Sequence, residues 1–250
     1  VFMLKFIFGR PASGKTYNVL NMINEIALSG KSAVLIVPEQ FSFESERAVL
    51  KALGDKAALN VSVMSFSRLC DEVGRAVGGI AGVTLTEADK VIFMNRALLA
   101  AADELKIWRR YCHSVFFAKT MLDTIGEFKI NTVTPESLKK AAEETESPSL
   151  ALKLHDIAVI YETYDTLVGE KFIDPADNLT KLFRQLENCR FFENKTVFLD
   201  SFKGFTGQQF RIIDRILSQA DDVIVSLTND PALDNDYNVF MNIRTTEKKI

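Results

Sequence analysis

An eight-residue segment near the start of the chain constrains the fold more than any other: residues 9–16 read GRPASGKT and match the pattern G-x-x-x-x-G-K-[ST]. The nearly continuous apolar run before it, residues 2–8, is typical of a strand buried on both faces of a parallel sheet. Apolar residues at helical spacing follow the segment and stop at Gly30. The order of strand, glycine-rich loop and helix predicts a phosphate-binding loop rather than a chance glycine-rich turn.

Each fixed position of this loop suits a nucleoside triphosphate. Gly9 and Gly14 allow backbone N–H groups to turn inward around a phosphate chain, and Ser13 belongs to the same turn. Lys15 is expected to reach the β- and γ-phosphates, and the Thr16 hydroxyl is expected to be a ligand of Mg²⁺. The sequence therefore predicts that these residues bind ATP together with Mg²⁺.

Strands alternate with helices at both ends of the chain, and this alternation predicts an α/β fold with a parallel sheet. The middle of the chain shows helical periodicity with hardly any strand signal. We expect one discontinuous domain from residues 1–77 and 190–250, interrupted by an all-helical insert at 78–189 that begins with a flexible Gly78–Gly82 hinge. Beyond the first strand, the predicted strands are 33–37, 61–66, 195–200 and 223–227; the predicted helices are 44–53, 87–105, 115–129, 135–144 with Thr134 as N-cap, 150–168, 175–186 and 208–218.

A phosphate-binding loop needs an acidic partner at the end of another buried strand to hold Mg²⁺. The segment Val197-Phe198-Leu199-Asp200 fits this requirement, so Asp200 is the predicted partner of Thr16. A hydrolysing enzyme usually places a glutamate next to this aspartate to orient the attacking water. Here the neighbour is Ser201, whose hydroxyl is a poor proton acceptor at neutral pH.

Four segments together resemble one family. They are the loop at 9–16, VPEQ followed by FSFE at 37–44, VMSFSRL at 63–69, and FLDSFKGFT at 198–206. The chain is similar to the N-terminal, helicase-like region of AddB, which belongs to the AddAB ATP-dependent helicase–nuclease that processes bacterial double-strand breaks. The resemblance covers the α/β regions at both ends of the chain, and the helical insert matches only in size and position.

The resemblance implies a RecA-like P-loop domain of the helicase 1A type, with 78–189 as a 1B-like helical subdomain. It implies an AddA-type helicase–nuclease subunit as heterodimer partner and DNA, single-stranded or as break ends, as substrate. An iron–sulfur cluster is implied only for a C-terminal nuclease region beyond residue 250. Gln209 stands where helicases of superfamily 1 often carry a nucleotide-motif glutamine. The family's single-strand contact motifs fall on Phe41, Ser42, Phe43, Ser65 and Phe66, whose phenylalanines are otherwise core residues.

Two departures from the helicase pattern affect the expected activity. Ser201 replaces the catalytic glutamate, and no adenine-reading glutamine motif precedes the first strand. Both departures favour an ATP-binding subunit that is not the motor. One alternative is an active superfamily 1 DNA translocase in which another residue places the water. A second alternative is a P-loop small-molecule kinase whose helical segment forms a lid.

Composition limits the remaining possibilities. With a formal charge of −3, nothing global indicates nucleic acid, so any DNA contact must come from a local surface. There is no apolar run of membrane-spanning length and no signal peptide, so we expect a cytoplasmic protein without membrane contact. The segment Trp108-Arg109-Arg110-Tyr111 interleaves cations with aromatic rings as nucleic-acid surfaces do, and its alternative is a solvated junction between helices. Cys70, Cys112 and Cys189 are expected to be reduced thiols, and His113 and His155 structural residues.

Overall fold

The computed structural model describes the chain except for residues 1–2, 79–81, 170, 230–245 and 247. Most of the predicted Gly78–Gly82 hinge therefore lies outside the described residues. Contacts divide the chain into two compact units, of which the first comprises 1–79 and 179–250 and the second 80–178. Across the described part of the chain, every helix is too short or too polar to cross a bilayer.

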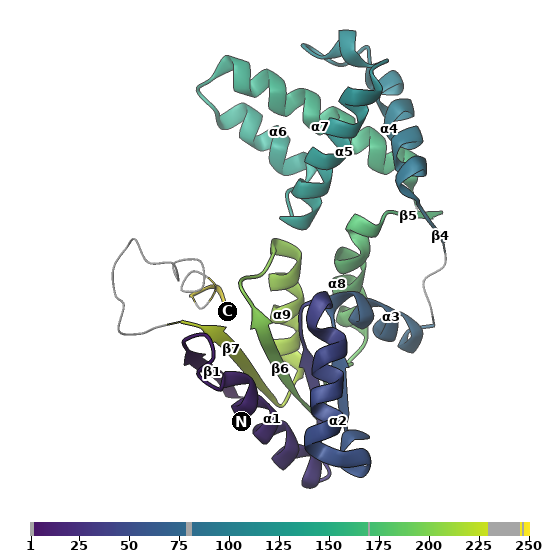
Figure 1. Ribbon diagram of the computed structural model, residues 1–250. Helices are drawn as coiled ribbons and strands as arrows, with labels where there is room; N and C mark the ends of the chain where they lie inside the picture. The colour runs from purple at the N-terminus through teal and green to yellow at the C-terminus, as the bar shows by residue number, and fades with distance from the viewer. Residues whose placement is uncertain (1–2, 79–81, 170, 230–245, 247) are drawn as a thin grey trace. The chain divides into compact units, whose positions relative to one another are not determined.

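The first unit is built on a five-stranded parallel sheet (Figure 1). The strand order β1-β7-β6-β2-β3 places β7 between the strand that leads into the phosphate-binding loop and the strand that carries Asp200. The predicted parallel α/β sheet is thus confirmed. The strands are β1 (Met3–Gly9), β2 (Ser32–Ile36), β3 (Val61–Met64), β6 (Lys195–Phe202) and β7 (Asp222–Thr228).

Both faces of this sheet are covered by helices, which explains why its strands are apolar without alternation. On one face, Val34 and Val197 pack with apolar residues of three helices: α3 (Phe66–Ala76), α8 (Asn178–Asn188) and α9 (Gly207–Gln219). On the other face, Leu35 and Phe198 pack with α1 (Lys15–Leu28) and α2 (Ser42–Ala58). Neighbouring residues of one strand therefore enter opposite cores.

The third strand is shorter than the sequence predicts, because Ser65 begins a helix. The predicted strand over 61–66 ends at Met64, and the Ser65 side chain accepts a hydrogen bond from the Arg68 backbone N–H at 3.2 Å. This serine cap starts α3, a helix that the sequence analysis did not include. The predicted helix over 175–186 is also divided, into a short 3₁₀ turn at Pro175–Asp177 and then α8.

The second unit consists mainly of helices, and the predicted capping of one of them is confirmed: Thr134 accepts a hydrogen bond from the Ser137 backbone N–H, with Pro135 in the first turn. The expectation of helices alone is wrong at one place. Two parallel two-residue strands, β4 (Val83–Thr84) and β5 (Phe172–Ile173), pair where the chain enters and leaves the unit. The helices are α4 (Glu87–Ala101), α5 (Val115–Ile130), α6 (Pro135–Glu144) and α7 (Pro148–Val168), with a 3₁₀ turn at Arg109–Tyr111.

A buried aspartate explains why α4 ends earlier than predicted. The apolar pattern continues to Leu105, which is buried, but the backbone leaves the helix after Ala101. Asp156 of α7 is fully buried and accepts hydrogen bonds from the backbone N–H groups of Lys106, Ile107 and Trp108 at 2.8, 2.9 and 3.1 Å. These bonds satisfy donors that the helix no longer pairs. The side chain of a distant residue thus decides where α4 stops.

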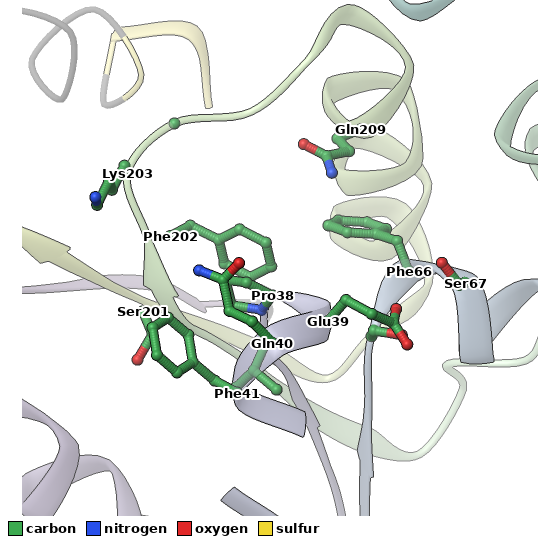
Figure 2. A pocket seen from close by; sticks show the side chains of 13 residues that line it. Pro38, Glu39, Gln40, Phe41, Phe66, Ser67, Ser201, Phe202, Lys203 and Gln209 are labelled. Carbon is green, nitrogen blue, oxygen red and sulfur yellow. The ribbon is translucent and has the colours of Figure 1, made fainter. Parts of the chain in front are cut away.

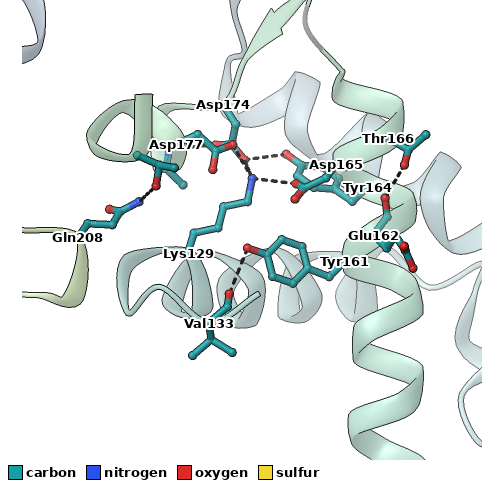
Figure 3. Close-up of polar contacts among 12 residues, drawn as sticks. Lys129, Val133, Tyr161, Glu162, Tyr164, Asp165, Thr166, Asp174, Asp177 and Gln208 are labelled. Atoms are coloured by element: carbon teal, nitrogen blue, oxygen red, sulfur yellow. Dashed lines mark hydrogen bonds and ion pairs between the residues drawn. The ribbon is translucent and has the colours of Figure 1, made fainter. Parts of the chain in front are cut away.

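A buried lysine joins α5 to the end of α7 and to the chain after β5 (Figure 3). The Lys129 ammonium contacts Asp165, Asp174 and Asp177 at 3.0, 3.1 and 2.6 Å, and its side chain is 2% exposed. Burial alone would lower the pKa of Lys129, but the three carboxylates outweigh it and raise that pKa. Tyr164 donates a further hydrogen bond to Asp174 at 3.3 Å. Lys129 therefore remains charged and ties three segments together.

Replacing this lysine is expected to destabilise the protein strongly. Lys129→Met leaves the carboxylates of the cluster without a counter-ion, and such a loss typically costs about 3 to 5 kcal/mol. Burial raises the pKa of Asp165 and the charge of Lys129 opposes that rise, so removing the cation raises this pKa further. The loss of stability is therefore largest at neutral pH and shrinks as the pH falls through that raised pKa. Urea unfolding at several pH values measures both effects.

The exposed Lys140, 3.7 Å from Glu144, provides the control: Lys140→Met should leave the unfolding free energy unchanged. Equal unfolding curves for Lys129→Met and wild type at pH 7 would contradict a supporting role for the cluster.

Candidate nucleotide and nucleic-acid site

The phosphate-binding loop connects β1 directly to α1. Gly14 is the N-cap of α1 and has a φ of 85°, a left-handed conformation that favours glycine. At Gly9 the limit is space, because an added Cβ would lie 3.2 Å from Cγ of Lys15 and would collide with Oγ of Ser13. The two glycines of the pattern are thus required for different reasons. Gly14 allows the turn into the helix, and Gly9 leaves space for side chains to fold over the end of the strand.

The Lys15 side chain folds back onto the loop. Its Nζ atom donates hydrogen bonds to the backbone carbonyls of Gly9 and Arg10, both at 2.9 Å. Partial burial lowers the pKa of Lys15, and the negative charge of Asp200 opposes that shift. A phosphate oxygen is a stronger partner for an ammonium than a neutral carbonyl, because charge-assisted hydrogen bonds are about twice as strong. The lysine is therefore positioned to exchange these two carbonyls for a bound phosphate.

Thr16 and Asp200 meet at the carboxyl edge of the sheet. The Thr16 hydroxyl donates a hydrogen bond to Oδ2 of Asp200 at 3.1 Å, although the two residues are 184 positions apart. Asp200 is 4% exposed and also accepts a hydrogen bond from the Ser201 hydroxyl at 3.4 Å. A hydroxyl and a carboxylate in contact are the pair of oxygen ligands that a nucleotide-bound Mg²⁺ needs from a protein. The residues present thus fit the predicted metal.

The rest of such a metal's coordination must come from outside the protein. Among the described residues, no group of three or more His, Cys, Asp and Glu side chains is arranged to hold a metal ion. Mg²⁺ commonly binds through one or two protein oxygens, with phosphate oxygens and water completing its octahedron. The Thr16–Asp200 pair therefore suits a metal that arrives with a phosphate ligand.

The residue after Asp200 has an unusual backbone. Ser201 has a φ of 66°, a left-handed value that is uncommon for serine, and the pairing of β6 with β7 shifts between Leu199 and Phe202. The position where a helicase carries its catalytic glutamate is therefore occupied by an exposed serine at an irregular point of the strand. Its hydroxyl supports Asp200, and it offers no carboxylate.

A carboxylate from another element lies beside the same pair. A pocket of about 280 Å³ is lined by Thr16, Asp200, Ser201 and, from the first turn of α2, Glu44. In the sequence, Glu44 is only the last residue of the FSFE segment, and no role for it was predicted. No motif spacing relates Glu44 to Asp200, because the parallel pairing of β2 with β6 brings the start of α2 to this edge.

A second pocket lies over the carboxyl ends of β2, β3 and β6 (Figure 2). It has a volume of about 340 Å³ and brings together three of the segments that carry the family resemblance. Residues 37–41 and 65–67 contribute one part of its lining, and residues 201–204 with Gln209 contribute the rest. Lys203 is the cation among these lining residues.

The structure separates the predicted single-strand contact residues into two groups. Phe41 and Phe43 are 37% and 69% exposed, so each offers part of a ring to solvent. Phe66 is 6% exposed and packs edge-on against Phe202 at 5.7 Å between ring centroids. The sequence left open whether these phenylalanines contact DNA or belong to the core, and the burial of Phe66 favours the core for this residue. Ser42 and Ser65 are also buried, and Ser65 caps α3.

Gln209 lines the second pocket but already has a local partner. Its side-chain oxygen accepts a hydrogen bond from the Thr206 backbone N–H at 2.9 Å, and the Thr206 hydroxyl accepts one from the Gln209 backbone N–H at 3.3 Å. This reciprocal pair is a capping box at the start of α9. Gln209 is not among the residues that line the pocket beside Thr16 and Asp200.

The arrangement of these motifs agrees with the comparison with known families. The family described as "ADDB, N-terminal" matches residues 6–250 of the chain. The chain belongs to this family. The resemblance that rested on four segments is thereby confirmed, and it extends through the middle of the AddB-type chain, where the sequence analysis found a match only in size and position.

Named relatives agree with this membership. Proteins named as the B subunit of an ATP-dependent helicase/deoxyribonuclease, from Clostridium tetani, Clostridium acetobutylicum and Caldanaerobacter subterraneus subsp. tengcongensis, are each 34% identical to the chain. Each alignment covers 99% of this chain and 22% of the relative. The AddB-type chain therefore spans about a fifth of the length of the curated relatives that it matches.

Proposed function

We propose that this chain is the ATP-binding, helicase-like N-terminal part of an AddB-type subunit of an ATP-dependent helicase/deoxyribonuclease that acts in the repair and recombination of DNA double-strand breaks. In this proposal, residues 1–77 and 190–250 form a RecA-like 1A domain and residues 78–189 a 1B-like subdomain. The partner is an AddA-type subunit that supplies the motor. The observation that carries the proposal is the contact of Thr16 with Asp200 beside a loop of the phosphate-binding pattern.

The roles of individual residues follow from their contacts. Backbone N–H groups of the loop between Gly9 and Gly14, apart from Pro11, which has none, surround the phosphates. Lys15 leaves the carbonyls of Gly9 and Arg10 to neutralise the β- and γ-phosphate charge. Thr16 and Asp200 hold Mg²⁺, which supplies charge neutralisation to the triphosphate when it is bound. Thr16 and Asp200 thus act from the positions that they already occupy, and Lys15 changes its hydrogen-bond partners.

The second pocket is proposed to take single-stranded DNA. Phe41 offers a partly exposed ring in the lining of the pocket, and Phe43, two residues further along the chain and outside that lining, offers a second exposed ring. An aromatic face stacks on any base without reading the sequence. Lys203 in the lining of the pocket supplies a positive charge for a backbone phosphate. Buried Ser65 and Phe66 would hold the wall of the pocket rather than touch the strand. Ser201 and Phe41 line both pockets, so the proposed nucleotide and strand sites share residues.

ATP binding by the isolated chain is the direct test. Wild type should bind ATP with Mg²⁺ in a calorimetric titration, and Lys15→Ala should abolish binding, because the variant lacks the ammonium that is proposed to contact the terminal phosphates. Lys31→Ala, which alters an exposed lysine after α1, is the matched control and should bind like wild type. Failure of wild type to bind ATP at millimolar concentrations of ATP and Mg²⁺ would contradict the proposal.

An active translocase is the second candidate, and Glu44 is the observation that favours it. This carboxylate lines the pocket of Thr16 and Asp200, which gives the chain a residue other than Ser201 for orienting a water. Family membership favours either function over a small-molecule kinase. Turnover also needs an arginine that stabilises charge on the γ-phosphate, and such arginines contribute about 10³- to 10⁵-fold in rate.

A phosphate-release assay separates the two candidates. We expect little or no ATP hydrolysis by this chain, with or without single-stranded oligonucleotide, since Ser201 lacks the required carboxylate. Stimulated turnover at about one per second, typical of phosphoryl-transfer enzymes, that disappears in both Lys15→Ala and Glu44→Gln would instead establish the translocase. Turnover that survives Lys15→Ala would indicate a contaminating enzyme and leave the expectation of an inactive chain in place.

A further inference from the structure

The second unit carries a basic and aromatic segment that the proposed function does not use. Residues 106–119 contain four Lys or Arg residues and no Asp or Glu, in a chain whose net charge is −3. This stretch therefore presents charge of one sign. Its cations are Lys106, Arg109, Arg110 and Lys119.

Buried and capping residues of the second unit fix the backbone of this segment. Asp156, fully buried in α7, accepts the three backbone hydrogen bonds from residues 106–108 described above. Further along, Cys112 is 2% exposed and packs in the core of the second unit. Ser114 then caps α5 by accepting a hydrogen bond from the Phe117 backbone N–H at 3.3 Å. The polar side chains of the segment thus project from a fixed support.

Aromatic contacts hold one of the cations in place. Phe117 contacts both Trp108 and Tyr111, with ring centroids 5.6 and 5.7 Å apart. The Arg110 guanidinium lies over the Tyr111 ring, 4.7 Å from its centroid. An arginine that is already stacked loses less side-chain entropy when it binds a phosphate than a free one does.

The outer side of the segment offers an aromatic ring and cations to solvent. Phe116 is 82% exposed, and the neighbouring Val115 is 56% exposed. Arg109 pairs with exposed Asp103 at 2.7 Å, whereas Arg110 and Lys119 form no ion pair within the ranges that the structure describes. Lys119 follows Phe116 by three residues on the same helix, and Arg110 precedes it by six. An exposed phenylalanine in one segment with two exposed cations is the combination that single-stranded nucleic acid recognises, with phosphates on the cations and a base on the ring.

We propose that this segment is a second binding surface for single-stranded DNA, in which Arg110 and Lys119 contact backbone phosphates and Phe116 stacks on an unpaired base. A protein partner is less favoured, because an interface core is usually depleted of lysine and the exposed apolar area here is limited to Val115, Phe116 and part of Tyr111. The proposal takes its ligand class from the proposed function but uses none of the residues of the nucleotide pocket.

Fluorescence anisotropy with a labelled oligothymidylate and the whole 250-residue chain tests the proposal. Phe116→Ala should weaken binding about tenfold through the lost stacking, and Phe116→Trp should restore it. Arg110→Ala should lower the slope of log affinity against log salt by about 0.7, the value for one phosphate contact on a single strand. Leu99→Ala and Lys140→Ala, at exposed positions of the same unit, are the matched controls and should bind like wild type.

Two further measurements locate the contact. A photo-crosslink from 5-iodouracil should map to the peptide that contains Tyr111 and Phe116, and ATP binding should be unchanged in Phe116→Ala and Arg110→Ala. Wild-type affinity in both variants, or crosslinks confined to the pocket of Phe41 and Lys203, would overturn the second surface while leaving the proposed function intact. Loss of ATP binding in Lys15→Ala with normal DNA binding would confirm that the nucleotide site is separate from the DNA-binding surface of Arg110, Phe116 and Lys119.

Discussion

Parallel pairing of β1, β7, β6 and β2 is the constraint on which the candidate nucleotide site depends. Because all these strands run the same way, the residues at their carboxyl ends meet at one edge of the sheet. The loop after β1, Asp200 on β6 and the start of α2 after β2 therefore converge, although they are far apart in the sequence. The shift in strand pairing between Leu199 and Phe202 falls where the chain after Asp200 enters the lining of the neighbouring pocket, so the two proposed ligands would be bound next to the same strand end.

Two buried charges organise the second unit in different ways. Lys129 contacts three carboxylates from the end of α7 and the chain after β5, and it holds α5 to both of these segments. Asp156 is paired with backbone N–H groups instead, and it fixes the course of the chain from Lys106 to Trp108. In both cases a buried charge is stabilised by several partners, as such groups require. The exposed cationic and aromatic residues near Arg110 are carried on the backbone that Asp156 fixes.

The parts of the fold that could be predicted from sequence are those with a local signal. The glycine pattern at 9–16 identified the loop, and apolar runs identified the strands that form the sheet. The sequence predicted that Asp200 is the partner of Thr16, because a phosphate-binding loop needs an acidic residue to hold Mg²⁺. In the structure the side-chain oxygens of the two residues lie 3.1 Å apart. Where a distant side chain decides the local structure, the sequence misled: Asp156 ends α4 before Leu105. Ser65 acts locally instead, and its role as a helix cap was missed because the apolar pattern of the strand continued to Phe66. Glu44 could not be found because its position near Asp200 results only from strand order.

The central claim is that Thr16 and Asp200 form the metal-binding end of a nucleotide site. Calorimetric titration with ATP, in the presence and in the absence of Mg²⁺, tests it most directly when wild type is compared with Asp200→Asn. The account predicts that Mg²⁺ strengthens ATP binding by wild type and gives no such gain in Asp200→Asn, whose affinity for metal-free ATP is equal to that of wild type or higher because a negative charge has been removed. An unchanged gain from Mg²⁺ in Asp200→Asn would contradict the account.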